Sequence, residues 1–491
     1  MIKQNLLKNP YWTSDDLGKS IPDSPHAVSV SLPHWSDVIA YEEKDQKCMK
    51  KLNTIYPRFG FNPYVKELSE NVLRSSALNG WSAWPYQDYI TARKAKNFCE
   101  GNLSISNTNI IEVNNIYYLL ANEKVTFKAK SFWQHTGLGL SSRIAAISLG
   151  KEVNISTKEN TIFAERKIKT RLANLYSCEA SNIELHPSGM ASLYRALEII
   201  YKIFPPRKTL QIGFPYVDVL KLPKNIFNGA DLIVDNNIDQ IKTIIKERNP
   251  AAIIIEIPSN PLLKCVDLPQ ISNIAHEYGI PLIVDDTIGT PINVSCLQYA
   301  DMIFSSLTKI FAGRGDILAG CLIINSQSQW GDKLRKTASQ IPTTYLSDPD
   351  IIELELTSRD VSERTQTLNK TCRKLKKKLE VHPKVKSVFH PESCINFNNL
   401  IKENGGYGCL LSFELNEDMI DIKKFYNSLK VCKGPSLGTN FTLACPYVLL
   451  AHYEELDWAR SHGLSSHLIR VSVGMEHPDE LWERFQSALS T

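Results

Sequence analysis

The sequence predicts an α/β fold, with a large domain built on a mainly parallel sheet and a smaller C-terminal α+β domain. Between residues 170 and 330, short apolar runs rich in Val and Ile recur, namely TLQIGF, AAIIIEI, PLIVDD, DMIFSSL and GCLIIN. Helix-forming stretches separate several of these runs. Uninterrupted apolar strands that alternate with helices are typical of a parallel sheet covered on both faces.

The predicted helices have recognisable ends. In DLPQISNIAHEYG, Asp267 can cap the first turn, Pro269 fits that turn, and Gly279 can end the helix. The last predicted helix, PDELWERFQSAL, begins with Pro478, and acidic residues follow in its first turn, where the helix dipole favours them.

A change of pattern near Ser347–Ile352 marks the expected start of the C-terminal domain. One long helix is predicted from there to Leu379, followed by strand candidates KVKSVFH, GCLLSFEL and LIRVSVG and a helix at DIKKFYNSL. The N-terminal part is rich in Asn, Lys, Trp and Tyr and shows no clear alternation of strands and helices. The predicted organisation is an N-terminal extension (1–130), a large domain (131–345) and a C-terminal domain (346–491).

The composition limits the classes of partner. At 491 residues, the chain is long enough for two or three subdomains, and its 43% hydrophobic and 22% charged residues are ordinary for a soluble globular protein. The net charge of +4 gives no reason to expect nucleic acid or a membrane as a partner. The dense basic run Arg373–Lys378 carries Leu375 and Leu379 at helical spacing, which indicates the solvated face of an amphipathic helix.

The cysteines and the N-terminus indicate a cytoplasmic protein. Eleven cysteines are scattered without a C-x-x-C pair, and their odd number argues against a disulfide framework or a zinc site, so a reducing compartment fits best. The N-terminal residues MIKQNLLKNPYWTSDD lack the apolar core of a signal peptide. No apolar run approaches the roughly 20 residues that span a bilayer.

Polar residues follow several of the predicted strands, at the edge of a parallel sheet where ligands bind. They are Asn260, Asp285, Asp286, Ser306, Thr308 and Lys309, with Gly189 and Met190 at the start of a helix. Taken singly they are ordinary, because glycine caps helices, aspartate starts turns and a lone lysine usually faces solvent. Together they supply a helix N-terminus and hydroxyls for a phosphate, an amine for a Schiff base, and a carboxylate for a pyridinium nitrogen. Pyridoxal 5′-phosphate requires these groups.

The longest motifs resemble the Cys/Met-metabolism family of pyridoxal-phosphate enzymes. The resemblance rests on EIPSNPLLKCVDLPQISNIAHEYGIPLIVDDTIGTP and ADMIFSSLTKIFAGRGDILAG, and PSGMAS, SLG and LIRVSVGMEHPDEL extend it over roughly residues 165 to 490. SVSLPHW, YPRFG and FWQHTGLGLSSR are similar to the long fungal-type cystathionine γ-synthase branch of that family. The resemblance implies the fold-type I transferase architecture, with pyridoxal 5′-phosphate as cofactor and small amino acids as substrates.

The resemblance also implies a role for each matching residue. Lys309 would hold the cofactor covalently and move protons between substrate carbons. Asp285 would pair with the pyridine nitrogen, with Asp286 behind it, and the forked guanidinium of Arg470 would bind the substrate α-carboxylate. The remaining implied contacts are Ser188, Gly189, Met190, Ser306 and Thr308 to the phosphate, Asn260 to the phenolic oxygen, and Ser436 to the substrate pocket.

Two places depart from the family pattern. The ring-stacking tyrosine is usually followed by two glycines and a threonine, whereas this chain has FPYVDVLKL, and Tyr216 is the implied counterpart, with a catalytic role. The family also takes a Tyr-x-Arg pair for the phosphate from a neighbouring subunit. Arg143 in GLSSR is the expected phosphate contact, and YPRFG offers Tyr56 and Arg58 as an alternative. An arginine that acts across an interface implies a homodimer or homotetramer with shared active sites.

The expected activity is γ-replacement on an O-acyl-homoserine with L-cysteine to give cystathionine, a step of transsulfuration and methionine biosynthesis. The motifs leave open elimination, as by cystathionine γ- or β-lyase, and sulfide addition, as by O-acetylhomoserine sulfhydrylase. A catalytically inactive regulatory scaffold is the alternative outside enzymes, and the retained Lys309, Asp285 and Arg470 argue against it. The glycine-rich HTGLGLSS is a weak match to a dinucleotide loop, because no clear strand precedes it.

Overall fold

The structure is a computed structural model that describes residues 5–76, 78–101, 107–234 and 237–491. Its centre is a seven-stranded sheet in the order β6-β12-β11-β10-β9-β7-β8. The strands are β6 (Ile183–His186), β7 (Thr209–Ile212), β8 (Ala230–Ile233), β9 (Ile253–Glu256), β10 (Leu282–Asp285), β11 (Met302–Ser305) and β12 (Gly320–Ile324). All neighbouring pairs are parallel except the two made by β12. The predicted α/β class with a mainly parallel sheet is confirmed.

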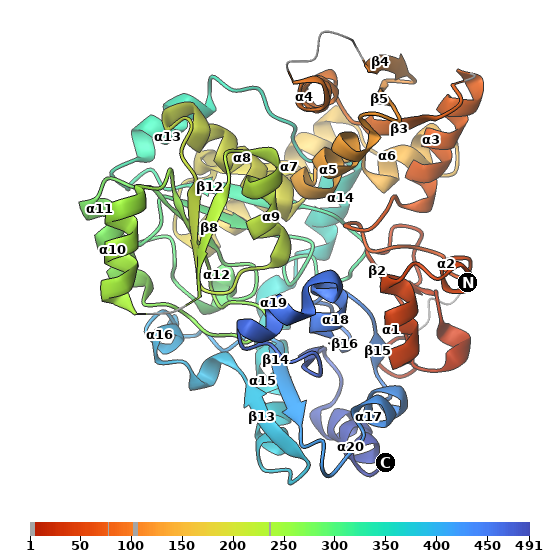
Figure 1. Ribbon diagram of the computed structural model, residues 1–491, viewed down its shortest axis with the longest axis vertical. Helices are drawn as coiled ribbons and strands as arrows, with labels where there is room; N and C mark the ends of the chain where they lie inside the picture. The colour runs from red at the N-terminus through yellow and green to blue at the C-terminus, as the bar shows by residue number, and fades with distance from the viewer. Residues whose placement is uncertain (1–4, 77, 102–106, 235–236) are drawn as a thin grey trace.

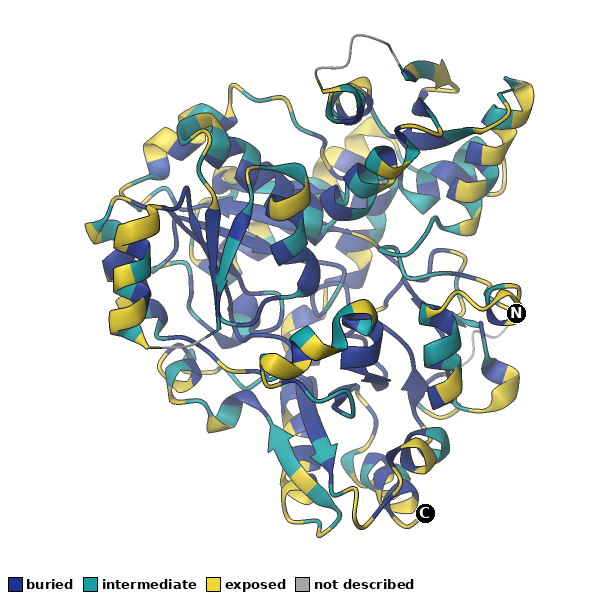
Figure 2. Cartoon of the chain, in the orientation of Figure 1, coloured by how far each residue is buried: buried dark blue, intermediate teal, exposed yellow. Residues whose placement is uncertain are grey.

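Helices cover both faces of this sheet (Figure 1). They are α7 (Lys158–Tyr176), α8 (Gly189–Ile203), α9 (Val217–Ile226), α10 (Ile238–Arg248), α11 (Leu268–Glu277), α12 (Thr290–Asn293) and α13 (Gly331–Ala338). Alternate strand residues enter different cores, since Ile253 and Val284 pack in one apolar cluster and Ile254 and Ile283 in another. The strands are accordingly buried on both faces, while α10 and α11 expose their outer sides (Figure 2).

The ends of α11 agree with the sequence signals. The Asp267 carboxylate accepts the amide N–H of Gln270, Pro269 lies in the first turn, and Gly279 after the helix has φ +65°. An L-residue with a side chain adopts this left-handed conformation only with strain, so the predicted stop by glycine is confirmed.

The C-terminal part contains a five-stranded sheet in the order β13-β14-β17-β16-β15. Its strands are β13 (Val385–Phe389), β14 (Leu410–Leu415), β15 (Cys432–Lys433), β16 (Leu443–Pro446) and β17 (Ile469–Ser472). The helices are α14 (Asp348–Thr357), α15 (Val361–Glu380), α16 (Ile395–Asn398), α17 (Ile422–Ser428), α18 (Tyr447–Ala451), α19 (Leu456–Ser461) and α20 (Pro478–Leu489). Leu375 and Leu379 of the basic run are buried in α15.

The prediction of one long helix reaching Leu379 is wrong, because α14 ends at Thr357 and α15 begins at Val361. The Ser358 hydroxyl donates to the Leu354 carbonyl and Arg364 pairs with Asp360, so each helix has its own terminal contacts. Short side-chain bonds of this kind compete with helix continuation.

The N-terminal part is more regular than its composition suggests. It holds a two-stranded sheet, β1 (Ser20–Ile21) and β2 (Ser29–Val30), and a three-stranded sheet in the order β3-β5-β4, formed by β3 (Trp81–Tyr86), β4 (Thr108–Val113) and β5 (Ile116–Asn122). The helices are α1 (Trp35–Glu42), α2 (Gln46–Met49), α3 (Pro63–Ser75), α4 (Tyr89–Glu100), α5 (Thr126–Thr136) and α6 (Ser142–Ser148). Short 3₁₀ turns complete the structure.

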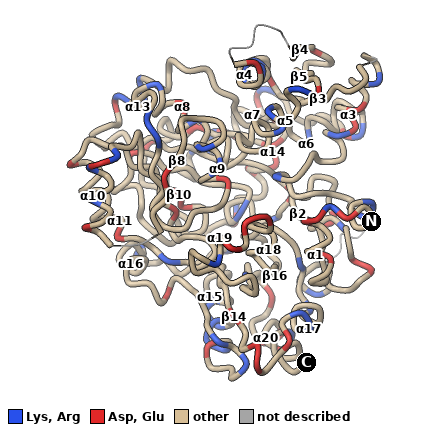
Figure 3. The backbone as a smooth tube through the Cα atoms, viewed as in Figure 1, with Lys and Arg blue, Asp and Glu red and all other residues tan. Residues whose placement is uncertain are grey.

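Charge is spread over the whole molecule. Lys and Arg alternate with Asp and Glu along the visible chain (Figure 3), in keeping with the small net charge of +4. All eleven cysteines are free thiols. Within the described ranges, we find no helix with the length and apolar character needed to cross a bilayer.

Candidate active site

A pocket lies beyond the carboxyl ends of β9, β10 and β11, and Glu256, Asp285 and Ser306 line it together with Ser436 and Arg470 from the C-terminal part. Its cavity of about 250 Å³ is far larger than the roughly 10–15 Å³ that one water needs. Residues from the N-terminal part, among them Tyr56 and Arg58, close one side of it. The strand-end rule for ligands in parallel sheets therefore holds here.

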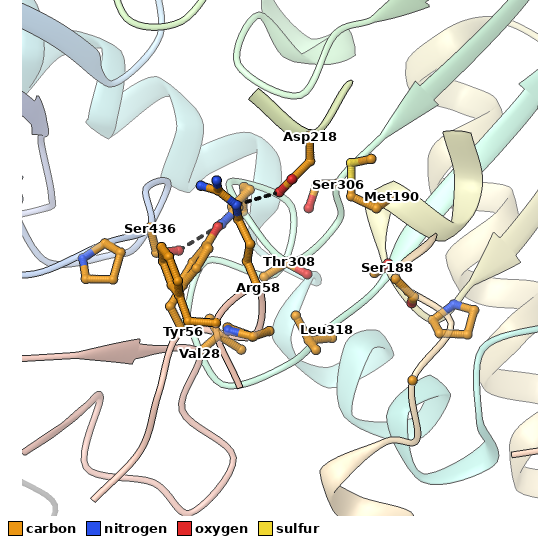
Figure 4. A pocket seen from close by; sticks show the side chains of 18 of the residues that line it. Val28, Tyr56, Arg58, Ser188, Met190, Asp218, Ser306, Thr308, Leu318 and Ser436 are labelled. Atoms are coloured by element: carbon orange, nitrogen blue, oxygen red, sulfur yellow. Dashed lines mark hydrogen bonds and ion pairs between the residues drawn. The ribbon is translucent and has the colours of Figure 1, made fainter. Parts of the chain in front are cut away.

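Lys309 projects into this pocket from the turn after β11. Its Nζ donates to Ser436 Oγ at 2.9 Å and to the Tyr56 hydroxyl at 3.4 Å, and it lies 5.4 Å from the centre of the Tyr56 ring. Gly313 and Gly315 then turn the chain with φ of +73° and +76°. Lys309, Ser436 and Tyr56 are therefore in contact although they are remote in the sequence, and Figure 4 shows Tyr56 beside Ser436.

A second part of the pocket is the N-terminus of α8. The Ser188 hydroxyl accepts the Ala191 amide and donates to the Gly137 carbonyl, so this side chain is fully engaged. The amides of Gly189 and Met190 have no acceptor in the described part of the chain. Gly189 packs against Ser306 so closely that an added Cβ would lie 2.7 Å from the Ser306 Cβ. Such a helix start is an anion site.

The two predicted hydroxyl contacts to the phosphate differ. Ser306 lies beside Met190 at this cradle (Figure 4), and its amide donates to the Thr287 hydroxyl at 2.9 Å. The Thr308 hydroxyl lines the same pocket but already accepts from the Ala319 amide at 3.0 Å and donates to the Ala319 carbonyl. Ser306 thus has the freer hydroxyl.

Two consecutive aspartates end β10. Asp285 lines the pocket and accepts the Thr287 amide at 3.0 Å; burial raises the pKa of its carboxyl to about 6, although hydrogen bonds from Thr287 oppose the shift. Asp286 lies behind it and accepts the Tyr176 hydroxyl at 2.9 Å. Burial raises the pKa of Asp286 to about 7.

Arg470 forms the wall opposite the sheet. One guanidinium nitrogen donates to the Ser436 carbonyl at 2.8 Å and another to Asn260 Oδ1 at 3.2 Å, and the group lies 4.6 Å from the centre of the Tyr447 ring. Ser436 has a φ of +96°, a strained conformation for a residue with a side chain, as at many functional sites. Arg470, Asn260 and Ser436 are brought together as the sequence leads us to expect.

The half-buried Tyr216 faces the pocket at the start of α9 and belongs to an ionic network. Its hydroxyl donates to Asp218 Oδ2 at 2.9 Å, and Arg58 Nε lies 3.1 Å from the same oxygen. His135 approaches the other oxygen at 3.4 Å. Burial would raise the pKa of Asp218, but the Arg58 guanidinium holds it below its usual value.

Of the two candidate sources of a phosphate-binding arginine, the structure brings only one into the pocket of its own chain. Tyr56 and Arg58 line the pocket, whereas Arg143 is bound to Asp350 Oδ1 at 3.1 Å and to the Asp316 carbonyl at 3.0 Å. Arg143 does not line the pocket in the described chain. A contact of Arg143 with a neighbouring subunit stays a prediction.

Two acidic groups of the site escaped the sequence reasoning. Glu256 pairs in register with Asp285 and accepts the Tyr216 amide at 2.8 Å, and burial raises its pKa well above the usual value. The position of Glu256 at the end of the apolar run AAIIIEI could have indicated that it belongs to the site. Asp218 gave no such signal, because its partner Arg58 is remote in the sequence.

These residues fit pyridoxal 5′-phosphate. The unpartnered amides at the start of α8 suit its phosphate, and Lys309 presents an amine to the same cavity. Among the described residues no cation contributes to the pKa of the buried Asp285 carboxyl, and a protonated pyridine nitrogen would supply one. Gly189 lets the start of α8 approach the backbone of Ser306 more closely than a residue with a side chain could.

Comparison with known proteins agrees with this donor set. A family model described as "Cys/Met metabolism PLP-dependent enzyme" matches residues 165–490. A cystathionine gamma-synthase of Neurospora crassa is 29% identical over 96% of this chain and 98% of its own. The cystathionine gamma-synthase of Saccharomyces cerevisiae is 27% identical over 97% and 99%. The crystal structure of cystathionine gamma-lyase from Lactobacillus plantarum has a TM-score of 0.58 at 21% identity and covers 67% of this chain and 86% of that one, which supports the fold.

Proposed function

Because the chain belongs to the Cys/Met metabolism family of PLP-dependent enzymes, we propose that it catalyses γ-replacement on an O-acyl-homoserine. The bond from the γ-carbon to the acyl oxygen breaks, the acyl group leaves as a carboxylate, and the sulfur of L-cysteine forms the new bond that gives cystathionine. The observation that carries the proposal is the convergence of Lys309, Asp285 and Arg470 on one pocket. Likeness to two cystathionine gamma-synthases over nearly their whole length supports the choice of reaction.

Each side chain has a task in this reaction. When bound, the cofactor supplies an electron sink for the charge that develops at the substrate α-carbon. Arg470 would bind the α-carboxylate through charge-assisted hydrogen bonds, and Asn260 and the Ser436 carbonyl hold its guanidinium in place. Lys309 would take protons from the α- and then the β-carbon, oriented by its hydrogen bond to Ser436 Oγ at 2.9 Å.

Asp285 would hold the pyridine nitrogen in its protonated form. A buried carboxylate beside a cation is stabilised in its charged state, so binding would reverse the raised pKa of Asp285. The amides of Gly189 and Met190 would bind the phosphate, with the Ser306 hydroxyl beside them. An inactive scaffold would need none of these groups.

A product screen tests the proposal. Purified protein loaded with pyridoxal 5′-phosphate is offered O-acetyl-, O-succinyl- or O-phosphohomoserine, each with cysteine, with sulfide or with no nucleophile. We expect cystathionine to form faster than homocysteine or 2-oxobutyrate. Faster formation of 2-oxobutyrate without a nucleophile would instead assign elimination, and homocysteine from sulfide would assign sulfhydrylation.

We further propose a cytoplasmic homodimer or homotetramer. The eleven free thiols support a reducing compartment. Arg143 itself does not line the pocket of its own chain in the described residues, and we assign it a contact with the phosphate site of a neighbouring subunit. Light scattering of the purified protein measures the assembly, and a monomer at micromolar concentration would contradict it.

A further inference from the structure

The segment that carries Tyr56 is bound to the C-terminal part of its own chain. The amide of Leu32 donates to the Lys433 carbonyl at 2.8 Å, the Tyr426 hydroxyl donates to the Leu32 carbonyl at 3.1 Å, and the buried Lys433 amine donates to the Pro33 carbonyl at 2.9 Å. Trp35 and other apolar residues of this segment share one buried cluster with β14, β17 and α20. The attachment is therefore continuous and apolar, as in a domain interior.

This attachment aims Tyr56 at Lys309. The Tyr56 amide donates to the Tyr41 hydroxyl at 3.3 Å, and the Tyr41 and Phe59 rings pack edge to face at 5.4 Å. Figure 4 places Tyr56 with Ser436, on the side of the pocket opposite Ser188 and Met190. Tyr56 thus faces the end where Lys309 and a substrate amine meet, and not the anion cradle of α8.

The two pocket phenols are held in different ways. Tyr216 donates its proton to the Asp218 carboxylate at 2.9 Å, so removing that proton would place two negative charges side by side. Burial and then Asp218 raise the pKa of Tyr216 well above its usual value. Burial would also raise the pKa of Tyr56, but the positive charge of Lys309, the hydrogen bond that Lys309 donates and the positive charge of Arg470 lower it.

We propose that Tyr56, supplied by the same chain, is the catalytic base that accepts a proton from the α-ammonium group of the incoming amino acid. In this step one N–H bond of the substrate ammonium group breaks, and its electron pair stays on the nitrogen. An O–H bond forms on the phenolate oxygen of Tyr56. The free amine is the form that can displace Lys309. The phenol returns the proton when the product amine leaves as an ammonium ion.

We assign the role of base to Tyr56 and not to Tyr216, because the Tyr216 hydroxyl already donates its proton to the Asp218 carboxylate. Asp218 itself is fixed by Arg58 from the same segment, at 3.1 Å. The titratable and charged groups that face Tyr56 are Lys309, Tyr216, Arg470, Arg58 and Tyr41. The inference rests on the proposed cofactor chemistry, but it requires only amine exchange and is independent of the γ-substituent.

Titration and spectroscopy of the loaded enzyme test the role of Tyr56. The ultraviolet absorbance of tyrosinate should titrate below the usual tyrosine range in the wild type and in Y216F, and this component should be missing in Y56F. The change in cofactor absorbance on adding an amino acid should slow by roughly 100-fold or more in Y56F, the usual scale for a lost general base. Tyr201→Phe, which removes the hydroxyl of a half-buried tyrosine in α8, should alter neither signal.

A Y56F enzyme that binds the cofactor and exchanges amino acids within about threefold of the wild-type rate would overturn the proposal, since general-base loss costs far more. The change in cofactor absorbance on adding an amino acid does not require γ-replacement. The proposal for Tyr56 can therefore fail while the product screen succeeds, and the product screen can fail while the proposal for Tyr56 holds. Retained circular dichroism of Y56F separates a catalytic loss from misfolding.

Complementation tests the origin of Tyr56. K309A and Y56F chains are co-expressed with different affinity tags and purified through both tags. If each chain supplies its own Tyr56, every site in the mixed oligomer carries one defect and no activity returns. Activity equal to one intact site per pair would mean that Tyr56 acts across subunits. If wild-type chains carrying the two tags also form no doubly tagged species, the protein is not assembled from several copies and Tyr56 acts within one chain.

Discussion

Replacing Asp285 by Asn should stabilise the cofactor-free protein at neutral pH while it destroys the site. Burial raises the pKa of Asp285 from 3.8 to about 6 in the folded chain. At about 1.4 kcal/mol for each tenfold change in proton affinity, this difference corresponds to about 3 kcal/mol. The ionised carboxylate therefore costs stability, and the cost is absent below pH 4 and complete above pH 6. Asn keeps an acceptor for the Thr287 amide and carries no charge.

The assay is denaturant unfolding of wild type and D285N without cofactor, at pH 4.5, 6 and 7.5. The advantage of D285N should grow from about 1 kcal/mol at pH 4.5 to about 3 kcal/mol at pH 7.5 and then level off. With pyridoxal 5′-phosphate present the order should reverse, because only the wild type gains an ion pair with the ring. A difference that is the same at every pH, or a D285N protein that is less stable without cofactor at pH 7.5, would refute the reasoning.

Asp218→Asn is the matched control, for which the expected change in stability has the opposite sign. It removes a buried carboxylate from the same pocket, but Arg58 lies 3.1 Å from it, and this guanidinium keeps the pKa of Asp218 below its usual value despite burial. D218N should therefore be less stable than wild type at pH 7.5, because it leaves the Arg58 charge without its partner.

Three further outcomes are expected. Arg470→Lys keeps the charge but loses the fork of donors, so KM for the amino acid should rise at least tenfold with a smaller change in kcat; an unchanged KM would remove Arg470 from carboxylate binding. Gly189→Ala places a Cβ 2.7 Å from the Ser306 Cβ, so unfolding free energy should fall by about 1–3 kcal/mol and cofactor affinity should drop; equal affinity by fluorescence titration would contradict the cradle. Ser306→Ala should weaken cofactor binding more than Thr308→Ala does, because the Thr308 hydroxyl is engaged by Ala319; the opposite order would show that the Thr308 hydroxyl turns to the phosphate.

The central sheet could be predicted from the sequence because its strands carry their own signal. Ile253, Ile254, Ile283 and Met302 are buried on alternate faces, so the runs are apolar without interruption. The N-terminal sheet had no such signal, since β4 exposes several of its side chains and is defined by its pairing with β5. The break between α14 and α15 depends on local side-chain bonds of Ser358, which leave little trace in an apolar periodicity.

Some residues of the site could likewise be predicted from the sequence, and others could not. Lys309, Asp285 and Ser306 follow apolar strands, and the topology of a parallel sheet brings strand ends together, so their convergence could be predicted. The contact of Tyr56 with Lys309 depends on the docking of a remote segment. Asp218 belongs to the site through Arg58 of that segment, an ion pair that sequence spacing does not reveal.

Borohydride reduction of the purified protein followed by peptide mass spectrometry tests most directly whether Lys309 holds the cofactor. The account predicts loss of the visible absorption band and one pyridoxyl adduct, on the peptide that contains Lys309. K309A should give no adduct while it keeps the circular dichroism of the wild type. An adduct on another lysine, such as Lys433, whose pKa burial lowers to about 7, would contradict the account, and so would full activity of K309A.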